Sequence, residues 1–338
     1  MDISRFILIA LLLLGQAGGA EVRPSSSEAV ARFDHHVHIL SPELVRDWRS
    51  LGVPFSRPES FYSSASVVLD QNRIEKAAVL SMAYLYGSRN FQRLKSSSVK
   101  EHEWARREND FIASLVRSAP KRLAGFYSVH PLRPYAMAEI RRCQKVQGLV
   151  GLKLHLYNSE VDLTNREHLD RLKEIFAWAE ENRVPLLLHL NVIGRTIRAE
   201  ALEILVRELI AKHPKTEIYI AHLGGFGGYS VPAEEVLKVF IKHLGPGGAL
   251  ESRELFFELS AVVLKESSEG VEPPGEERLR QLASDLRSLG LKRILFGSDH
   301  PVFNAQDYAL TLQQKLNMTS EEIQQILNNE APVLKRLR

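Results

Sequence analysis

The sequence of 338 residues lacks the features of several specialised protein classes. Its one cysteine, Cys143, excludes an intrachain disulfide and a metal site built from several thiolates. With 20 glycines and 15 prolines, it is not a fibrous or low-complexity chain. Neither sign of charge prevails, because 44 basic residues face 41 acidic ones without a basic block. Nucleic acid is therefore not an expected partner, and a composition of 44% hydrophobic and 25% charged residues indicates a globular protein.

The first twenty residues have the layout of a secretory signal peptide. Arg5 precedes an apolar run over residues 6–14, and small residues follow up to Ala20. This run is about half as long as a bilayer crossing requires, and an uncleaved anchor is the alternative. We expect cleavage after Ala20, no transmembrane anchor in the mature chain, and a single domain over residues 21–338. Export without disulfides favours a periplasmic or secreted protein of a bacterium.

Eight short runs rich in aliphatic and aromatic residues predict buried parallel strands. They cover residues 32–40, 77–84, 123–130, 149–156, 184–192, 217–223, 255–263 and 293–299. Helical patterns separate most of them, over residues 101–118, 135–146, 166–182, 199–213, 233–243 and 276–289. This alternation predicts an α/β fold of the (β/α)8 TIM barrel type. A doubly wound open sheet is the alternative, but no Gly-x-Gly-x-x-Gly turn follows an early strand.

The segment of residues 41–67 is too long for a routine connection after the first strand. It contains several aromatic and arginine side chains. We expect it to be an insertion over the C-terminal ends of the strands, where barrel active sites lie.

Polar side chains gather where these buried strands end. Seven of the twelve histidines lie there, namely His36, His38, His130, His155, His189, His222 and His300. Alternation along the first strand predicts that Asp34, His36 and His38 share one face. His189 ends the fifth run, and Asp299 ends the eighth, which neighbours the first in a closed barrel. Three imidazoles and a carboxylate, with room for water, are the donor set of a catalytic zinc site.

With these motifs the sequence resembles the amidohydrolase superfamily, specifically the amidohydrolase-related branch that includes aminocarboxymuconate-semialdehyde decarboxylase. The likeness runs from about Phe33 to the C-terminus and rests on Asp34-x-His36-x-His38, His189, Ala221-His222-Leu223-Gly224-Gly225 and Phe296-Gly297-Ser298-Asp299-His300-Pro301. It implies a distorted barrel of the metallo-dependent hydrolase type. It further implies that His36, His38 and His189 bind one divalent ion, usually zinc, with Asp299 as a further ligand. In such relatives the residue matching His222 handles protons beside the metal.

Other polar residues near the strand ends have roles that the sequence leaves open. Either His222 or Asp299 could accept the proton of a metal-activated water, and Asp34 is expected to orient a ligand. Lys153 is predicted to bind an anion or another polar group in the barrel, and a carboxylated lysine that bridges two metal ions is the alternative. Three further residues are predicted to contact substrate, with hydrogen bonding within loops as the alternative: His155, His130 and Arg195.

These features favour an enzyme that acts on a small-molecule substrate. The main hypothesis is a metal-dependent hydrolase of a small ester, lactone or amide, with metal-activated water as the nucleophile. The alternative is a non-oxidative decarboxylase or hydratase of a small carboxylic acid on the same site. A binding protein on a degenerate barrel is disfavoured because every principal ligand position is filled, and a homodimer is compatible with the sequence.

Overall fold

The computed structural model describes residues 29–53, 55–89, 91, 100–190, 199–225, 227–266 and 272–337. The predicted signal peptide and Arg195 lie outside the described residues. Within the described part of the chain, no helix combines the length and the apolar character needed to span a membrane.

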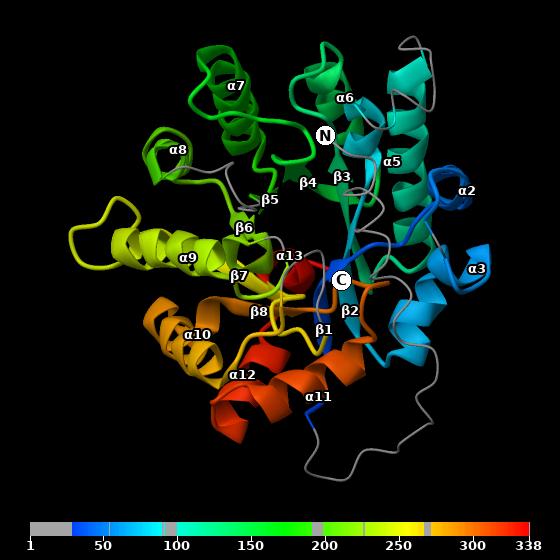
Figure 1. Cartoon of the computed structure of the whole chain (residues 1–338). Helices are drawn as coiled ribbons and strands as arrows, with labels where there is room; N and C mark the ends of the chain where they lie inside the picture. Colours follow the sequence, from blue (N-terminus) through cyan, green and yellow to red (C-terminus); the bar gives the residue numbers. More distant parts are fainter. Residues whose placement is uncertain are drawn as a thin grey trace.

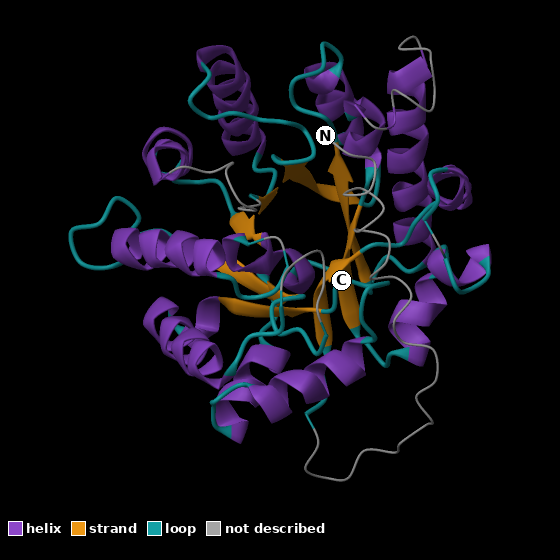
Figure 2. Cartoon of the chain, viewed as in Figure 1, coloured by secondary structure: helices purple, strands orange, loops and turns teal. Residues whose placement is uncertain are grey.

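Eight parallel strands form one sheet that closes on itself, as the sequence predicts (Figure 2). They are β1 (Phe33–Val37), β2 (Lys76–Leu80), β3 (Leu123–Ser128), β4 (Leu149–His155), β5 (Leu186–His189), β6 (Ile218–Ile220), β7 (Leu255–Ser260) and β8 (Ile294–Gly297). The barrel closes between β1 and β8, where the Asp299 amide donates to the His36 carbonyl at 2.9 Å and the His38 amide donates to the His300 carbonyl at 2.7 Å. The prediction of a (β/α)8 barrel is therefore confirmed.

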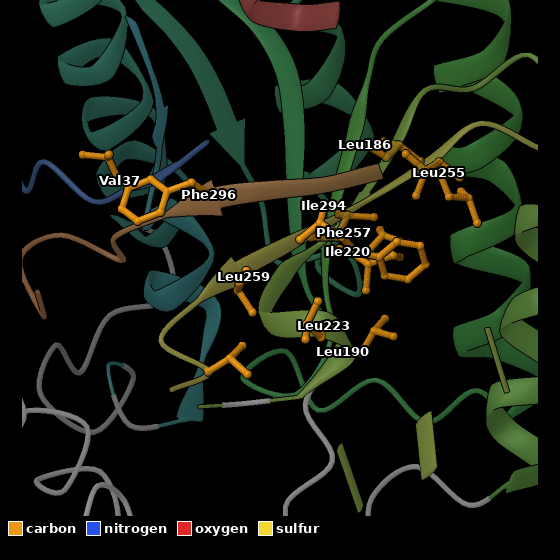
Figure 3. Close-up of a cluster of buried hydrophobic side chains, with 14 of the residues drawn as sticks. Val37, Leu186, Leu190, Ile220, Leu223, Leu255, Phe257, Leu259, Ile294 and Phe296 are labelled. Atoms are coloured by element: carbon orange, nitrogen blue, oxygen red, sulfur yellow. The ribbon is translucent and has the colours of Figure 1, made fainter. Parts of the chain in front are cut away.

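Helices surround the strands in the order of the chain (Figure 1). They are α5 (Glu101–Ser118), α6 (Ala136–Cys143), α7 (Arg166–Asn182), α8 (Ala199–Ile204), α9 (Val231–Leu244), α10 (Glu276–Leu289), α11 (Ala305–Lys315) and α12 (Ser320–Asn328). Their apolar faces pack on the outward side chains of the strands, as the cluster around Phe257, Leu259 and Phe296 illustrates (Figure 3). This layer holds the strand ends, and thus the polar residues on them, in fixed positions.

The segment after β1 folds as two helices beside the C-terminal ends of the first strands. These are α2 (Pro42–Ser50) and α3 (Glu59–Tyr62). Ser41 caps α2, since its Oγ accepts the Leu44 amide at 3.1 Å. Trp48 and Tyr62 pack in one buried cluster with Tyr84, which belongs to the short helix η3 (Ala83–Gly87) after β2. The insertion thus supports a tyrosine that reaches the polar end of the barrel.

A short C-terminal helix, α13 (Pro332–Lys335), closes the opposite end of the barrel (Figure 1). Val333 and Leu334 join the side chains that fill the barrel interior, including Phe33 and Tyr219. His35 lies at this end, where its Nε2 accepts the Ala331 amide at 3.1 Å. The interior is therefore filled at the N-terminal ends of the strands, and only their C-terminal ends remain available for a site.

Candidate active site and metal centre

Three side chains from the two strands that close the barrel converge on one point. The Nε2 atoms of His36 and His38 lie 3.2 Å apart. Asp299 Oδ1 lies 3.5 Å from the first and 3.6 Å from the second. The His36 side chain is inaccessible to solvent, whereas His38 and Asp299 keep 12% and 16% of their side-chain surface exposed. The group is therefore reachable from one side only.

Hydrogen bonds fix the tautomers of both imidazoles. His36 Nδ1 donates to the Glu258 carboxylate at 2.6 Å, and His38 Nδ1 donates to the Leu80 carbonyl at 3.1 Å. Because a carbonyl oxygen can only accept, the proton of His38 is on Nδ1. The short contact with an acidic partner gives His36 the same tautomer. The two Nε2 atoms therefore present lone pairs to each other and to a carboxylate oxygen.

A cation between these three donors resolves their mutual repulsion. Two donors on one ion lie no further apart than twice the bond length, about 4.2 Å for a zinc–nitrogen bond of about 2.1 Å. The three separations satisfy this limit, and neutral imidazole with carboxylate is a common donor set for divalent metals. Among the described residues, these three, His36, His38 and Asp299, therefore form a site for a divalent metal ion.

Burial keeps the imidazoles of this site neutral. It lowers the pKa of His36 and His38 well below the ordinary value, and the nearby ammonium of Lys153 lowers both further. Burial also raises the pKa of Asp299, against the opposing effect of His222 and Lys153. Neutral imidazole is the form that binds metal, so the electrostatics of the site favour ligation.

Glu258 on β7 is a functional residue that the sequence analysis missed. It is 1% exposed, and it holds the imidazole of His36. Burial raises the pKa of its carboxyl well above the ordinary value, while Lys153 opposes this effect. The available signal was one charged residue in a strand of six residues whose other members are apolar except for the terminal Ser260. Carboxylates that orient a metal-binding histidine in this way strengthen the metal site.

Asp34, which is expected to orient a ligand, contacts the backbone of this site. A register irregularity lies between Asp34 and Val37, so simple alternation does not hold along β1. Asp34 Oδ1 accepts the backbone amides of His36 at 3.2 Å and Ser298 at 2.9 Å. It therefore fixes the backbone at the junction of β1 and β8, next to His36, and its role in orienting a metal ligand stays a prediction.

The remaining rings continue as an arc around the barrel mouth. The His222 ring lies 4.6 Å from that of His36 and 4.6 Å from that of His189, measured between centroids. His189 stacks on His155 at 3.9 Å, and His155 lies 4.7 Å from Tyr84. The structure thus gathers His189, His222 and His155 beside the metal group, as expected, but His189 is not in the group of three ligand atoms. Its role as a ligand stays a prediction.

His222 occupies a strained turn where the sixth strand ends. The strand predicted over 217–223 stops at Ile220, and His222 has a φ of 52°. Leu223, Ala261 and Asp299 also have φ near 50°, so four of the seven described non-glycine residues with positive φ lie at the ends of β6, β7 and β8. Such backbone strain concentrates at functional sites. His222 Nδ1 donates to the Ser260 carbonyl at 2.8 Å, which leaves the Nε2 lone pair available for a proton.

The predicted substrate contacts differ in how closely they approach this group. Lys153 Nζ lies 3.1 Å from His38 Nε2. Burial lowers the pKa of Lys153 to about 8, so its side chain remains mostly cationic at neutral pH. His130 packs at the end of β3 against Gly87, where a Cβ would come within 2.5 Å of it. Whether His130 contacts substrate stays a prediction, and Arg195 lies outside the described residues.

Comparisons with known proteins bear on this site. The model of the amidohydrolase family matches residues 33–329 of the chain. Gamma-resorcylate decarboxylase of Polaromonas sp. strain JS666 is 24% identical over 233 residues, which cover 62% of this chain and 69% of that protein.

Solved structures share the barrel at low sequence identity. The 5-carboxyvanillate decarboxylase of Sphingomonas paucimobilis has a TM-score of 0.58 at 14% identity, covering 91% of this chain and 99% of its own. Dihydroxybenzoic acid decarboxylase of Polaromonas sp. JS666, solved with manganese and 2-nitroresorcinol, has a TM-score of 0.57 at 16% identity, covering 91% of this chain and 98% of its own. These two likenesses support the fold.

Proposed function

Because the chain belongs to the amidohydrolase family, and is an enzyme of that family, we propose that it is a metal-dependent, non-oxidative decarboxylase of a small aromatic carboxylic acid. The sequence favoured hydrolysis of an ester, lactone or amide and kept decarboxylation as the alternative. Relatives named as decarboxylases of hydroxylated aromatic acids support that alternative better than the main hypothesis.

This reaction replaces one carboxylate by one proton. The aromatic acid takes up a proton at the ring carbon, the carbon–carbon bond to the carboxylate breaks, and CO2 leaves while its bonding electrons restore the ring. The site must hold an anionic substrate and deliver a proton, and it needs no nucleophilic water. A divalent ion, when bound, supplies charge stabilisation to oxygen atoms of the substrate.

Different residues of this chain would bind the metal ion and deliver the proton. His36, His38 and Asp299 would hold the ion, with His189 as the proposed fourth ligand. His222 would hold the proton on Nε2 and deliver it to the ring carbon, because Ser260 fixes its other nitrogen. Asp299 is the second candidate for the proton, since its carboxyl is close enough to His222 for that ring to lower its pKa.

One observation carries the metal-dependent part of the proposal. His36 and His38 present two lone pairs at 3.2 Å to each other, and a carboxylate completes the triangle. The sequence suggests zinc, whereas the structure of one relative contains manganese. Metal analysis of the purified protein identifies the ion, and we expect about one per chain.

The experiment that tests the proposal compares two reaction classes on the same preparation. Protein loaded with manganese or zinc is offered 2,6-dihydroxybenzoate and 5-carboxyvanillate, and in parallel an aryl ester, a lactone and an amide. We expect CO2 release from an aromatic acid and no hydrolysis. His36→Ala should lose both the ion and the activity. Turnover of the ester or lactone without decarboxylation would reject the proposal, as would full activity of the metal-free wild type.

A further inference from the structure

A buried lysine that forms no ion pair among the described residues lies beside the metal group. Lys153 is on β4 and is 1% exposed. Its Nζ contacts His38 Nε2 at 3.1 Å; the carboxylates of Asp299 and Glu258 act on it electrostatically, but neither forms an ion pair with it among the described residues. Buried lysines are rarely left in this state, because removing an ammonium from water is unfavourable unless an anion compensates it.

Metal binding would remove the one hydrogen-bond acceptor that Lys153 has here. The Nε2 lone pair of His38 is the donor that points to the metal group, since its Nδ1 is bound to the Leu80 carbonyl. One lone pair cannot serve an ion and an ammonium together. Asp299 is also committed to the ion. The loaded site therefore needs a further anion that faces Lys153.

The walls around Lys153 are flat and aromatic. Its Nζ lies 5.9 Å from the centroid of the Tyr84 ring, and the Tyr84 and His155 rings lie 4.7 Å apart with an angle of 38° between their planes. Both rings are buried, with exposures of 1% and 3%. A planar ring can pack on such a wall, and the lysine at its base supplies a positive charge.

We propose that Lys153 binds the carboxylate of the substrate and that Tyr84 and His155 form the wall for its aromatic ring. This inference rests on the proposed function and names the residues that hold the carboxylate and the ring of its aromatic substrate. Lys153 contacts the substrate before and during proton transfer to the ring. It therefore contributes to binding of the substrate in the ground state and in the transition state. Loss of such an interaction raises KM more than it lowers kcat.

The test measures binding of a charged probe and a neutral probe to the metal-loaded full chain. The probes are 2,6-dihydroxybenzoate and 2,6-dihydroxybenzamide, which differ in one charge, and calorimetry gives both dissociation constants. We expect Lys153→Met to weaken binding of the benzoate by about 10- to 100-fold, the range for a hydrogen bond to a charged group. Binding of the benzamide should change by less than about threefold. Lys153→Arg should recover part of the loss, and the exposed Lys121→Met is the matched control.

Several outcomes would overturn the inference. Equal weakening of both probes would make Lys153 a structural residue, and unchanged benzoate binding would remove it from the site. Two metal ions per wild-type chain, with one lost in Lys153→Met, would make it a carboxylated bridge. If Lys153→Met does not fold, the wild type decides, because failure to prefer the benzoate over the benzamide contradicts the inference. Charge-dependent binding without CO2 release would support Lys153 as the anion site and reject the proposed function alone.

Discussion

Replacing Glu258 with glutamine should weaken metal binding without unfolding the protein. Glu258 accepts the Nδ1 proton of His36 at 2.6 Å, and both side chains are buried. The carboxylate orients the imidazole and makes Nε2 a better donor. Loss of such a partner lowers metal affinity by about 10- to 100-fold. This factor corresponds to about 1.4–2.7 kcal/mol of binding free energy.

The same substitution should have a different effect on the metal-free protein. Burial raises the pKa of Glu258, so a negative charge at this position is unfavourable when no cation is nearby. Glutamine keeps an acceptor for His36 without that charge. We therefore expect the free energy of unfolding of metal-free Glu258→Gln to equal or exceed that of the wild type. At saturating metal, the stabilisation that the ion supplies should be smaller by about 1.4–2.7 kcal/mol.

Chelator competition measures the metal dissociation constant, and urea unfolding with and without metal measures the stability. Glu254→Gln is the control, because Glu254 is exposed and lies next to β7. An affinity of Glu258→Gln within threefold of the wild type would refute the reasoning. A strongly destabilised metal-free variant would also refute it, because the carboxylate would then serve the fold.

Four further predictions concern other parts of the chain. His222→Asn should keep the metal but lower turnover by about 10²–10⁴-fold, and metal content and rate on one preparation check this, with a metal-depleted variant as the contrary result. Burial lowers the pKa of His35 to about 4. The unfolded chain therefore binds a proton at His35 that the folded chain excludes, and the contribution of His35 to the free energy of unfolding should fall by about 3 kcal/mol as the pH drops from 6.5 to 4. Urea unfolding of metal-free His35→Gln should lack this part of the slope, and an unchanged slope contradicts it. Leu334→Ala should cost about 2–5 kcal/mol in urea unfolding, because Leu334 is fully buried in the barrel interior; a loss below about 1 kcal/mol would be inconsistent with this packing. Mass spectrometry should find the mature N-terminus at or near Glu21, unless residues 1–20 persist in the soluble protein.

Local patterns were sufficient to predict most of the barrel. The helices α5, α7 and α10 have the bounds that the sequence predicts, because their apolar periodicity and their stop signals are local. The helix predicted over 233–243 begins earlier, at Val231, since the Ser230 hydroxyl accepts the Ala233 amide. Five of the seven histidines at the strand ends converge as predicted, because parallel strands of a barrel end on one side: His36, His38, His155, His189 and His222.

Features that depend on distant partners could not be predicted in this way. Ile220 ends β6 three residues before the predicted end, and the left-handed turn at His222 has no sequence signal such as glycine. The register irregularity in β1 lies in its pairing with β2, and the contact of Asp34 with the Ser298 amide joins residues 264 positions apart. The contact of Glu258 with His36 joins residues 222 positions apart. Only its burial marks the Glu258 carboxylate as part of the site, and this burial exists only in the closed barrel.

The position of α13 also determines how late in synthesis the barrel can be completed. Synthesis runs from the N-terminus at about 5–20 residues per second, so α13 emerges about 15–60 s after Val37, the end of β1. For most of this interval β1 has no β8 beside it, and until α13 has been made the inner surface around Phe33 lacks part of its cover. An uncovered strand edge with exposed apolar side chains is prone to aggregation. The nascent chain therefore depends on protection of its first strand until α13 has been made.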